Sequence, residues 1–240
     1  MDTFSILITN DDGIRSDGII RLARATKQLG EVWVVAPDGQ RSAASHSITL
    51  HSPIDIYPCS FPVPGVHAFS CSGTPGDCVR VGSLFVMPRK PDVVLSGINY
   101  GYNVASDIQY SATAGAAFEA SFQGLPGIAL SEEACSCHDT TDAFLPVVLE
   151  QLIGRRPEPG TIINVNFPGC PASSCKGILE GRNVSSREVF ADRYLEQKKL
   201  ENGGVRVMVQ GVWQGEAEPG TDYRAVLDGF ISIGVVRNIG

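Results

Sequence analysis

Short apolar runs alternate with segments of helical periodicity over roughly the first 170 residues. Runs rich in β-branched and aliphatic residues predict strands at residues 4–9, 32–36, 91–96, 128–130 and 161–167. Helical spacing predicts helices at residues 18–29, 75–87, 111–123 and 141–152. Strands that alternate with helices are typical of parallel sheets, so we expect an α/β fold, a Rossmann-like mostly parallel sheet with helices on both faces.

The pattern changes after residue 169, where glycines and prolines separate short strand-like pieces. No linker divides the chain, so we expect a single domain over residues 1–240, with residues 169–224 as a β-rich elaboration. Within it, residues 204–213 predict a strand of an arm or hairpin, and we expect this region to lie at a subunit contact.

Composition narrows the classes of function. The 240 residues are 43% hydrophobic, which is enough for a sizeable core. The net charge of -7 and the absence of a basic cluster argue against binding to a nucleic acid polymer. A small anionic substrate is compatible with this charge if a metal ion supplies the positive charge. No targeting signal or membrane-spanning stretch is present, so we expect a cytoplasmic protein without a membrane partner.

The seven cysteines are an odd number in a chain without a secretion signal, so we expect reduced thiols. The alternative is a structural zinc site that joins Cys135, Cys137 and His138 to Cys170 and Cys175. Its C-x-C-H beginning lacks the usual ligand spacing, which disfavours that interpretation.

Ligands of open parallel sheets bind beyond the carboxyl ends of the strands, and the loops there carry polar residues. The first predicted strand is followed by the sequence NDDG, residues 10–13. Adjacent carboxylates such as Asp11 and Asp12 repel each other unless a cation lies between them. The alternative is a simple turn, because Asn, Asp and Gly all favour turns.

Two further loops add neutral oxygen atoms and one guanidinium. Residues 36–45 contain hydroxyl groups and Arg41, which can form a forked contact with a phosphate, and residues 96–103 contain Asn99 and Asn103. Each loop can equally be a surface turn. Together, the three loops predict an all-oxygen site that suits Mg²⁺ or Mn²⁺ better than zinc.

Residues 110–113 open the helix of small residues. A helix N-terminus with hydroxyl caps binds phosphate through its free N–H groups, although plain capping is the alternative. Residues 72–77 begin another helix with Thr74, Pro75 and Asp77 in the positions of a capping box, and we expect capping to be their main role.

These blocks, in this order, resemble the SurE family of survival-protein nucleotidases. The matching blocks are 6–13 (ILITNDDG), 34–42 (VVAPDGQRS), 73–79 (GTPGDCV), 91–99 (PDVVLSGIN), 110–113 (YSAT) and 220–222 (GTD). The resemblance implies a metal-dependent phosphatase of nucleoside 5'-monophosphates, with 3'-monophosphates and short polyphosphate as further substrates. It also implies a homodimer or homotetramer with exchanged C-terminal segments.

The resemblance further implies one divalent metal ion per subunit, Mg²⁺ or Mn²⁺. Its implied ligands are Asp11, Asp12, Ser42 and Asn99. Asn103, Ser111 and Thr113 are then expected around the phosphate or the attacking water. We expect Asp11, Asp12 and Ser111 to act in catalysis, with Arg41 or the helix at Ser111 stabilising the developing charge.

Two departures from the family pattern bear on activity. The family usually has glycine where this chain has Ala112, which would cost about 1 kcal/mol if that position needed a left-handed backbone. Many relatives also continue beyond residues 228–232 with a longer tail, so an acid from that tail cannot be transferred to this chain. The alternative function is therefore a weakened metal- or phosphate-binding protein of the same fold.

No general base is evident from the sequence. His46 follows the hydroxyl-rich loop and is a candidate for proton transfer, although a hydrogen-bonding role is the commoner one. His51 and His67 are expected to be structural. A phosphoacceptor signalling domain lacks support because its acceptor Asp and catalytic Lys are not in place, and a zinc de-N-acetylase would need a histidine where Asn10 stands.

Overall fold

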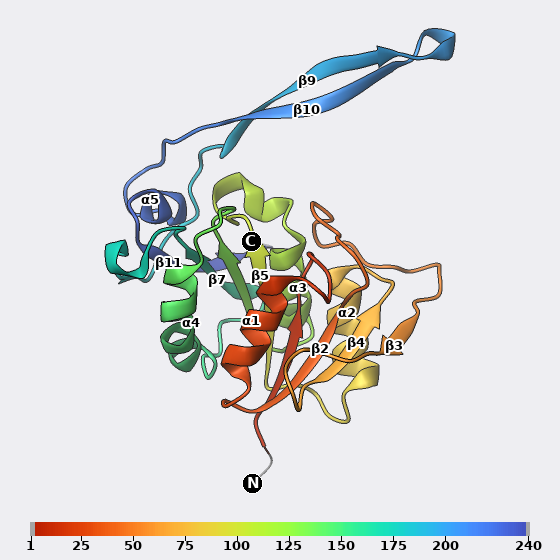
Figure 1. Ribbon diagram of the computed structural model, residues 1–240, viewed down its shortest axis with the longest axis vertical. Helices are drawn as coiled ribbons and strands as arrows, with labels where there is room; N and C mark the ends of the chain where they lie inside the picture. Colours follow the sequence, from red (N-terminus) through yellow and green to blue (C-terminus); the bar gives the residue numbers. More distant parts are fainter. Residues whose placement is uncertain (1–2, 239–240) are drawn as a thin grey trace.

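The computed structural model describes residues 3–238 and contains a nine-stranded sheet in the order β3-β4-β2-β1-β5-β6-β7-β11-β8 (Figure 1). Its strands are β1 (Ser5–Thr9), β2 (Glu31–Pro37), β3 (Ile56–Pro58), β4 (His67–Cys71), β5 (Val93–Tyr100), β6 (Gly127–Glu132), β7 (Thr161–Phe167), β8 (Ile178–Leu179) and β11 (Ile231–Arg237). The pairs among β4, β2, β1, β5, β6 and β7 are parallel, whereas β3 and β11 run antiparallel to β4 and β7.

Helices cover both faces of this sheet. They are α1 (Asp17–Thr26), α2 (Pro75–Val81), α3 (Ala112–Phe122), α4 (Asp139–Leu152) and the short α5 (Asp222–Leu227). Alternation along β1 separates the two faces: Ile6 and Ile8 pack in one core cluster with residues of α1 and α4, and Leu7 packs in another with residues of α2 and α3. The predicted fold class, a mostly parallel sheet between two helical layers, is confirmed.

Several elements differ from the prediction in detail. The helix predicted over residues 75–87 is α2 followed by one π-helical segment, η1 (Gly82–Val86), which Met87 closes with a hydrogen bond from its N–H to the Gly82 carbonyl. The strands β3, β4, β8 and β11 were not predicted. β3 and β8 are short edge strands, of three and two residues. β4 and β11 mix apolar and polar residues, and each is held by a strand on either side.

The small residues of α3 allow close packing on two sides. A Cβ atom at Gly127, where β6 begins, would lie 2.2 Å from the Ala117 carbonyl oxygen of α3. On its other side, a Cβ at Gly115 would lie 2.6 Å from the Ser45 carbonyl oxygen. The helix is therefore fixed between the sheet and the hydroxyl-rich loop that follows β2.

An antiparallel hairpin of β9 (Phe190–Lys199) and β10 (Val205–Trp213) projects from the body of the molecule (Figure 1). All residues of both strands are exposed, including Val207, Met208 and Trp213. The structure thus contains the hairpin predicted for this region, and its contact with another subunit stays a prediction. The short segments η2 (Ala105–Gln109), η3 (Ala172–Ser174) and η4 (Glu201–Gly203) are 3₁₀ turns. None of the described helices has the length and apolarity to cross a membrane.

The close approach at Gly127 predicts a loss of stability on substitution. Gly127→Ala introduces a methyl group against backbone that cannot yield, so we expect the free energy of unfolding to fall by about 1–3 kcal/mol. Gly154→Ala is the control, because a Cβ there meets no atom within 4 Å. Urea denaturation of both variants checks this, and equal midpoints would contradict the packing described.

Candidate functional site

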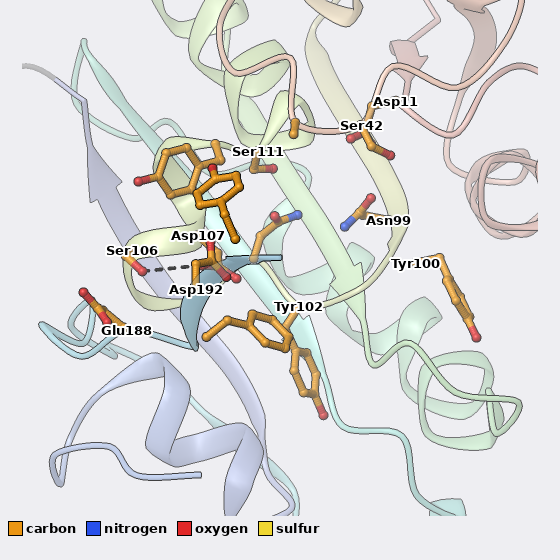
Figure 2. A pocket seen from close by; sticks show the side chains of 15 residues that line it. Asp11, Ser42, Asn99, Tyr100, Tyr102, Ser106, Asp107, Ser111, Glu188 and Asp192 are labelled. Atoms are coloured by element: carbon orange, nitrogen blue, oxygen red, sulfur yellow. Dashed lines mark hydrogen bonds between the residues drawn. The ribbon is translucent and has the colours of Figure 1, made fainter. Parts of the chain in front are cut away.

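The loops that follow β1, β2 and β5 meet at the carboxyl edge of the sheet and border a pocket of about 790 Å³ (Figure 2). Five of the residues expected in the site line this pocket: Asp11, Ser42, Asn99, Asn103 and Ser111. Figure 2 shows Asp11, Ser42 and Asn99 near one another at one end. The topology therefore assembles residues that are distant in the sequence.

Of the two aspartates after β1, Asp11 is buried and Asp12 is partly buried, and no basic side chain in the described residues pairs with either. Asp11 is 4% exposed, and its Oδ1 accepts a hydrogen bond of 2.5 Å from the Thr113 hydroxyl. Burial raises the pKa of Asp11 to about 6; the Thr113 bond opposes this rise, and the charge of Asp12 adds to it. Burial also raises the pKa of Asp12, against hydrogen bonds from the Tyr100 N–H and from Gln40.

The local sequence explains why the turn has this shape. The Asn10 side chain donates to the Gly13 carbonyl (3.0 Å) and to the Ser16 hydroxyl (2.7 Å), which closes the loop in front of α1. Gly13 adopts a φ of 95°, a conformation that favours glycine. Residues 10–13 therefore form a turn, and this turn is compatible with a cation site at Asp11 and Asp12.

Negative charge in the pocket is not compensated by the protein. Its lining contains four carboxylates, Asp11, Asp107, Glu188 and Asp192, and no Lys, Arg or His. Within residues 3–238, neither Asp11 nor Asp12 takes part in an ion pair. Asp11 is a buried carboxylate without an ion-pair partner, which is costly, so its end of the pocket favours a cation.

The neutral oxygens at the same end are oriented by local hydrogen bonds. Asn99 donates its Nδ2 to the Gly101 carbonyl (2.8 Å), which leaves its Oδ1 available as an acceptor, and the Ser42 Oγ lies 3.0 Å from Gln40 Nε2. The Ser42 loop is attached to the residues before α3 by the bond from Ser45 N–H to the Tyr110 carbonyl (3.1 Å). Asp11, Ser42 and Asn99 bring a carboxylate, a hydroxyl and an amide oxygen to the pocket, whereas Asp12 does not line it and accepts from the Tyr100 N–H. Oxygen donors of these kinds fit Mg²⁺ or Mn²⁺.

Ser111 caps α3 at the pocket wall. Its Oγ accepts from the Ala114 N–H (3.0 Å), and no acceptor for the N–H groups of Ala112 and Thr113 is found in the described part of the chain. Ala112 is the first helical residue and is not among the residues with positive φ. Ala112 does not have the left-handed backbone in which its Cβ would cause strain. The free N–H groups at the helix N-terminus are available to an anion.

The other expected residues lie in other contacts. Thr113 does not line the pocket, and its hydroxyl is bound to Asp11. Arg41 also lies outside the lining, with its guanidinium 2.9 Å from Asp38 Oδ1. His46 stacks on Phe122 and lies 2.9 Å from Glu119 Oε2, a structural contact away from the pocket. His67 stacks on Trp33.

Comparison with known proteins decides the family. The family model described as Survival protein SurE matches residues 6–188. This chain belongs to the SurE family. Its relatives include a protein named 5'-nucleotidase SurE from Gemmatimonas aurantiaca, 39% identical over 234 residues that cover 95% of this chain and 90% of the relative. One of the same name from Thermosipho melanesiensis is 35% identical over 232 residues, covering 95% and 89%.

Solved structures agree with this assignment. The crystal structure of the SurE protein from Aquifex aeolicus matches with a TM-score of 0.80 at 32% identity, covering 97% of this chain and 93% of that chain. Membership of the SurE family therefore extends over the strands and loops that carry the site described above.

A network of buried asparagines in this SurE chain was not anticipated from the sequence. Asn103 accepts on its carbonyl from the side chains of Asn164 (2.8 Å) and Asn166 (3.0 Å), and its N–H donates to Asn166 Oδ1 (2.8 Å). The Asn103 side chain donates to the Ser131 hydroxyl (2.8 Å). The signal was present, because two asparagines alternate within the otherwise apolar strand β7, where a polar side chain needs a buried partner.

Two of the family blocks have mainly structural roles. Thr74 and Asp77 form a capping box at α2, as expected. Asp222 is buried and accepts from the N–H groups of Ala105 (3.2 Å) and Ser185 (2.9 Å). It thereby joins α5 to the 3₁₀ turn η2, which borders the pocket.

The zinc alternative gains no support from the structure. Over residues 3–238, no three His, Cys, Asp or Glu residues are grouped so that they could hold a metal ion, and the seven cysteines are free thiols. His138 instead lies 3.0 Å from Glu132, which also binds the buried Arg21. The proposed Mg²⁺ or Mn²⁺ site is not a group of this kind, because only two of its expected ligands are carboxylates and the others are neutral oxygens.

The asparagine network predicts a specific loss of stability. Asn166→Ala leaves the buried N–H and C=O of Asn103 with fewer partners, so we expect the free energy of unfolding to fall by about 1–3 kcal/mol. The exposed Asn183→Ala serves as control. Chemical denaturation measures both; a wild-type midpoint for Asn166→Ala would show that the network does not stabilise this edge of the sheet.

Proposed function

We propose that this chain is a metal-dependent phosphomonoesterase that hydrolyses nucleoside 5'-monophosphates to nucleoside and phosphate. One observation carries the proposal. The pocket places a hydroxyl-capped helix N-terminus beside carboxylates that no basic side chain neutralises, so an anionic substrate needs an accompanying cation. The relatives named 5'-nucleotidase SurE support the same reaction and substrate.

One Mg²⁺ or Mn²⁺ per subunit is proposed to be held by Asp11, Asp12, Ser42 and Asn99. When bound, such an ion supplies Lewis-acid charge compensation for a phosphoryl group. The Thr113 hydroxyl fixes the carboxylate of Asp11 by its bond to Oδ1, which leaves Oδ2 for the site. Arg41 is retained only as an indirect contributor, because it is paired with Asp38.

The phosphate oxygens are proposed to lie against the first turn of α3. The Ser111 cap and the free N–H groups of Ala112 and Thr113 present positive dipole ends to charge that develops there. Asn103, which is fixed by its buried network, lines the same wall. The rest of the pocket has room for a nucleoside, and Tyr102 and Phe190 supply aromatic surface for it.

The finer expectations belong to the same proposal. We include 3'-monophosphates and short polyphosphate as substrates to be tested, and a homodimer or homotetramer as the assembly. The hairpin supports an assembly, since a two-stranded ribbon is marginal in water on its own and this one exposes apolar residues such as Met208 and Trp213.

Phosphate release tests the proposed function. Purified protein with Mn²⁺ or Mg²⁺ is expected to release phosphate from a nucleoside 5'-monophosphate, and chelation is expected to abolish the activity. Asp11→Asn is expected to lower kcat/KM at least about 100-fold, because it removes a charged ligand. Glu150→Gln, an exposed charge change on α4, is the control. No release with any metal or substrate would leave the alternative, a binding protein of this fold.

The contact between Thr113 and Asp11 generates a second prediction. Thr113→Val keeps the shape but removes the donor, so we expect kcat/KM to fall about 10- to 100-fold, as for other groups that orient a metal ligand. Thr113→Ser keeps the hydroxyl and is expected to remain close to the wild type. Similar activity of the two variants would show that the hydroxyl does not position Asp11.

A further inference from the structure

One wall of the pocket is a continuous stretch of chain, residues 103–111. Asn103, Asp107 of the turn η2 and the helix cap Ser111 all line the pocket (Figure 2). Backbone hydrogen bonds run along this stretch: the Asp107 N–H donates to the Val104 carbonyl (3.1 Å), and the Asp107 carbonyl accepts from the Ser111 N–H (3.1 Å). A displacement where η2 begins would therefore move the N-terminus of α3.

The turn η2 begins with a backbone conformation that L-residues rarely adopt. Ala105 has a φ of 51°, in the left-handed region, and is 1% exposed. Such a conformation persists only where the surrounding structure fixes it. The groups that contact Ala105 therefore determine where η2 and Ser111 lie.

Asp222 of α5 supplies a fixed group of this kind. The residue is buried, and its Oδ2 accepts from the Ala105 N–H (3.2 Å). Its Oδ1 accepts from the Ser185 N–H (2.9 Å) and from the Tyr223 N–H (2.7 Å). Val104, Ala105 and Tyr223 also pack in one core cluster. The carboxylate thus holds the left-handed turn against α5 and against the segment that leads to the hairpin.

We infer that Asp222, which does not itself line the pocket, is a positioning residue that acts on the phosphate through Ala105, η2 and Ser111. The inference rests on the proposed function, in which phosphate oxygens lie against the first turn of α3. The proposed metal ligands depend on other contacts, because they follow β1, β2 and β5, and α3 is fixed separately at Gly115 and Gly127. Loss of the Asp222 contact is therefore expected to affect phosphate more than metal.

Asp222→Asn separates the contact with η2 from the other two contacts. An amide offers one acceptor oxygen, whereas its NH2 group only donates. We expect the oxygen to stay with the N–H groups of Ser185 and Tyr223, which both bind Oδ1, and the NH2 group to face the Ala105 N–H, where two donors repel. The variant keeps two of the contacts and loses the one that holds the left-handed turn.

Calorimetry measures phosphate and metal binding separately. For Asp222→Asn we expect the affinity for inorganic phosphate, measured with Mg²⁺ present, to fall about three- to tenfold. The affinity for Mg²⁺ alone is expected to stay within about twofold of the wild type. With a nucleoside 5'-monophosphate, kcat/KM is expected to fall at least about tenfold, because misplaced groups stabilise the transition state poorly.

Glu218→Gln is the control for the Asp222 variant and is expected to leave all three values unchanged. The hydrogen bonds and ion pair of Glu218 in the described residues go to residues 185–187 at the hairpin root and not to η2.

Ala105→Gly in the Asp222→Asn background tests the route through the turn. Glycine adopts a φ of 51° without steric cost, so we expect the double variant to recover phosphate affinity and kcat/KM at least about threefold. Circular dichroism confirms that the compared samples are folded. No recovery of either value would overturn the route.

Hydrogen exchange of the wild-type protein tests the inference without a variant. Coupling between two sites is reciprocal, so we expect phosphate with Mg²⁺ to slow exchange of the Ala105 N–H at least about threefold. The Leu200 N–H at the hairpin tip, bonded to the Gly204 carbonyl (2.8 Å), is the control and is expected to exchange at an unchanged rate.

Unchanged phosphate affinity in Asp222→Asn, equal losses of phosphate and Mg²⁺ affinity, or unchanged exchange of the Ala105 N–H would each overturn the inference. If the wild type hydrolyses no nucleotide, phosphate binding and hydrogen exchange still decide it. Weaker phosphate binding by the variant would then keep the positioning role and contradict only the phosphatase reaction.

Discussion

The burial of Asp11 beside Asp12 is the constraint on which the rest of the site depends. Both residues directly follow the buried strand β1 at the carboxyl edge of the sheet, where no basic side chain in the described part of the chain pairs with them. Burial raises the pKa of Asp11 to about 6, so its ionised form is disfavoured until positive charge is supplied. The neighbouring oxygens of Ser42 and Asn99 then have a clear use as further ligands.

The elements around this pair are fixed by close packing. Gly115 lets α3 contact the loop that carries Ser42, and Thr113 of the same helix holds Asp11. One helix therefore orients a carboxylate, positions a hydroxyl loop and presents its N-terminus through Ser111. Both the fold and the site therefore depend on this helix of small residues.

Much of this arrangement was predictable from the sequence. The alternation of short apolar runs with helical segments predicted the parallel sheet. The position of Asp11, Ser42 and Asn99 directly after strands predicted that they would lie together at one edge of it. The network of Asn103 with Asn164 and Asn166 was not predictable, because it joins residues about 60 positions apart whose contact depends on strand register.

The carboxylates that Asp107, Glu188 and Asp192 add to the pocket were not predicted, for a similar reason. Glu188 and Asp192 belong to the region predicted as a β-rich elaboration. They line the same pocket as Asp107 because the chain returns past η2. The backbone conformation of Ala112 could not be predicted from the sequence either. A glycine at this position in the family does not show whether the backbone there is left-handed. The structure shows a helical residue there.

The most direct test of the account is titration of the substrate-free protein with Mn²⁺, followed by electron paramagnetic resonance. We predict one bound ion per chain and at least about tenfold weaker binding in Asp12→Asn; no bound Mn²⁺, or equal binding by the variant, would contradict the account.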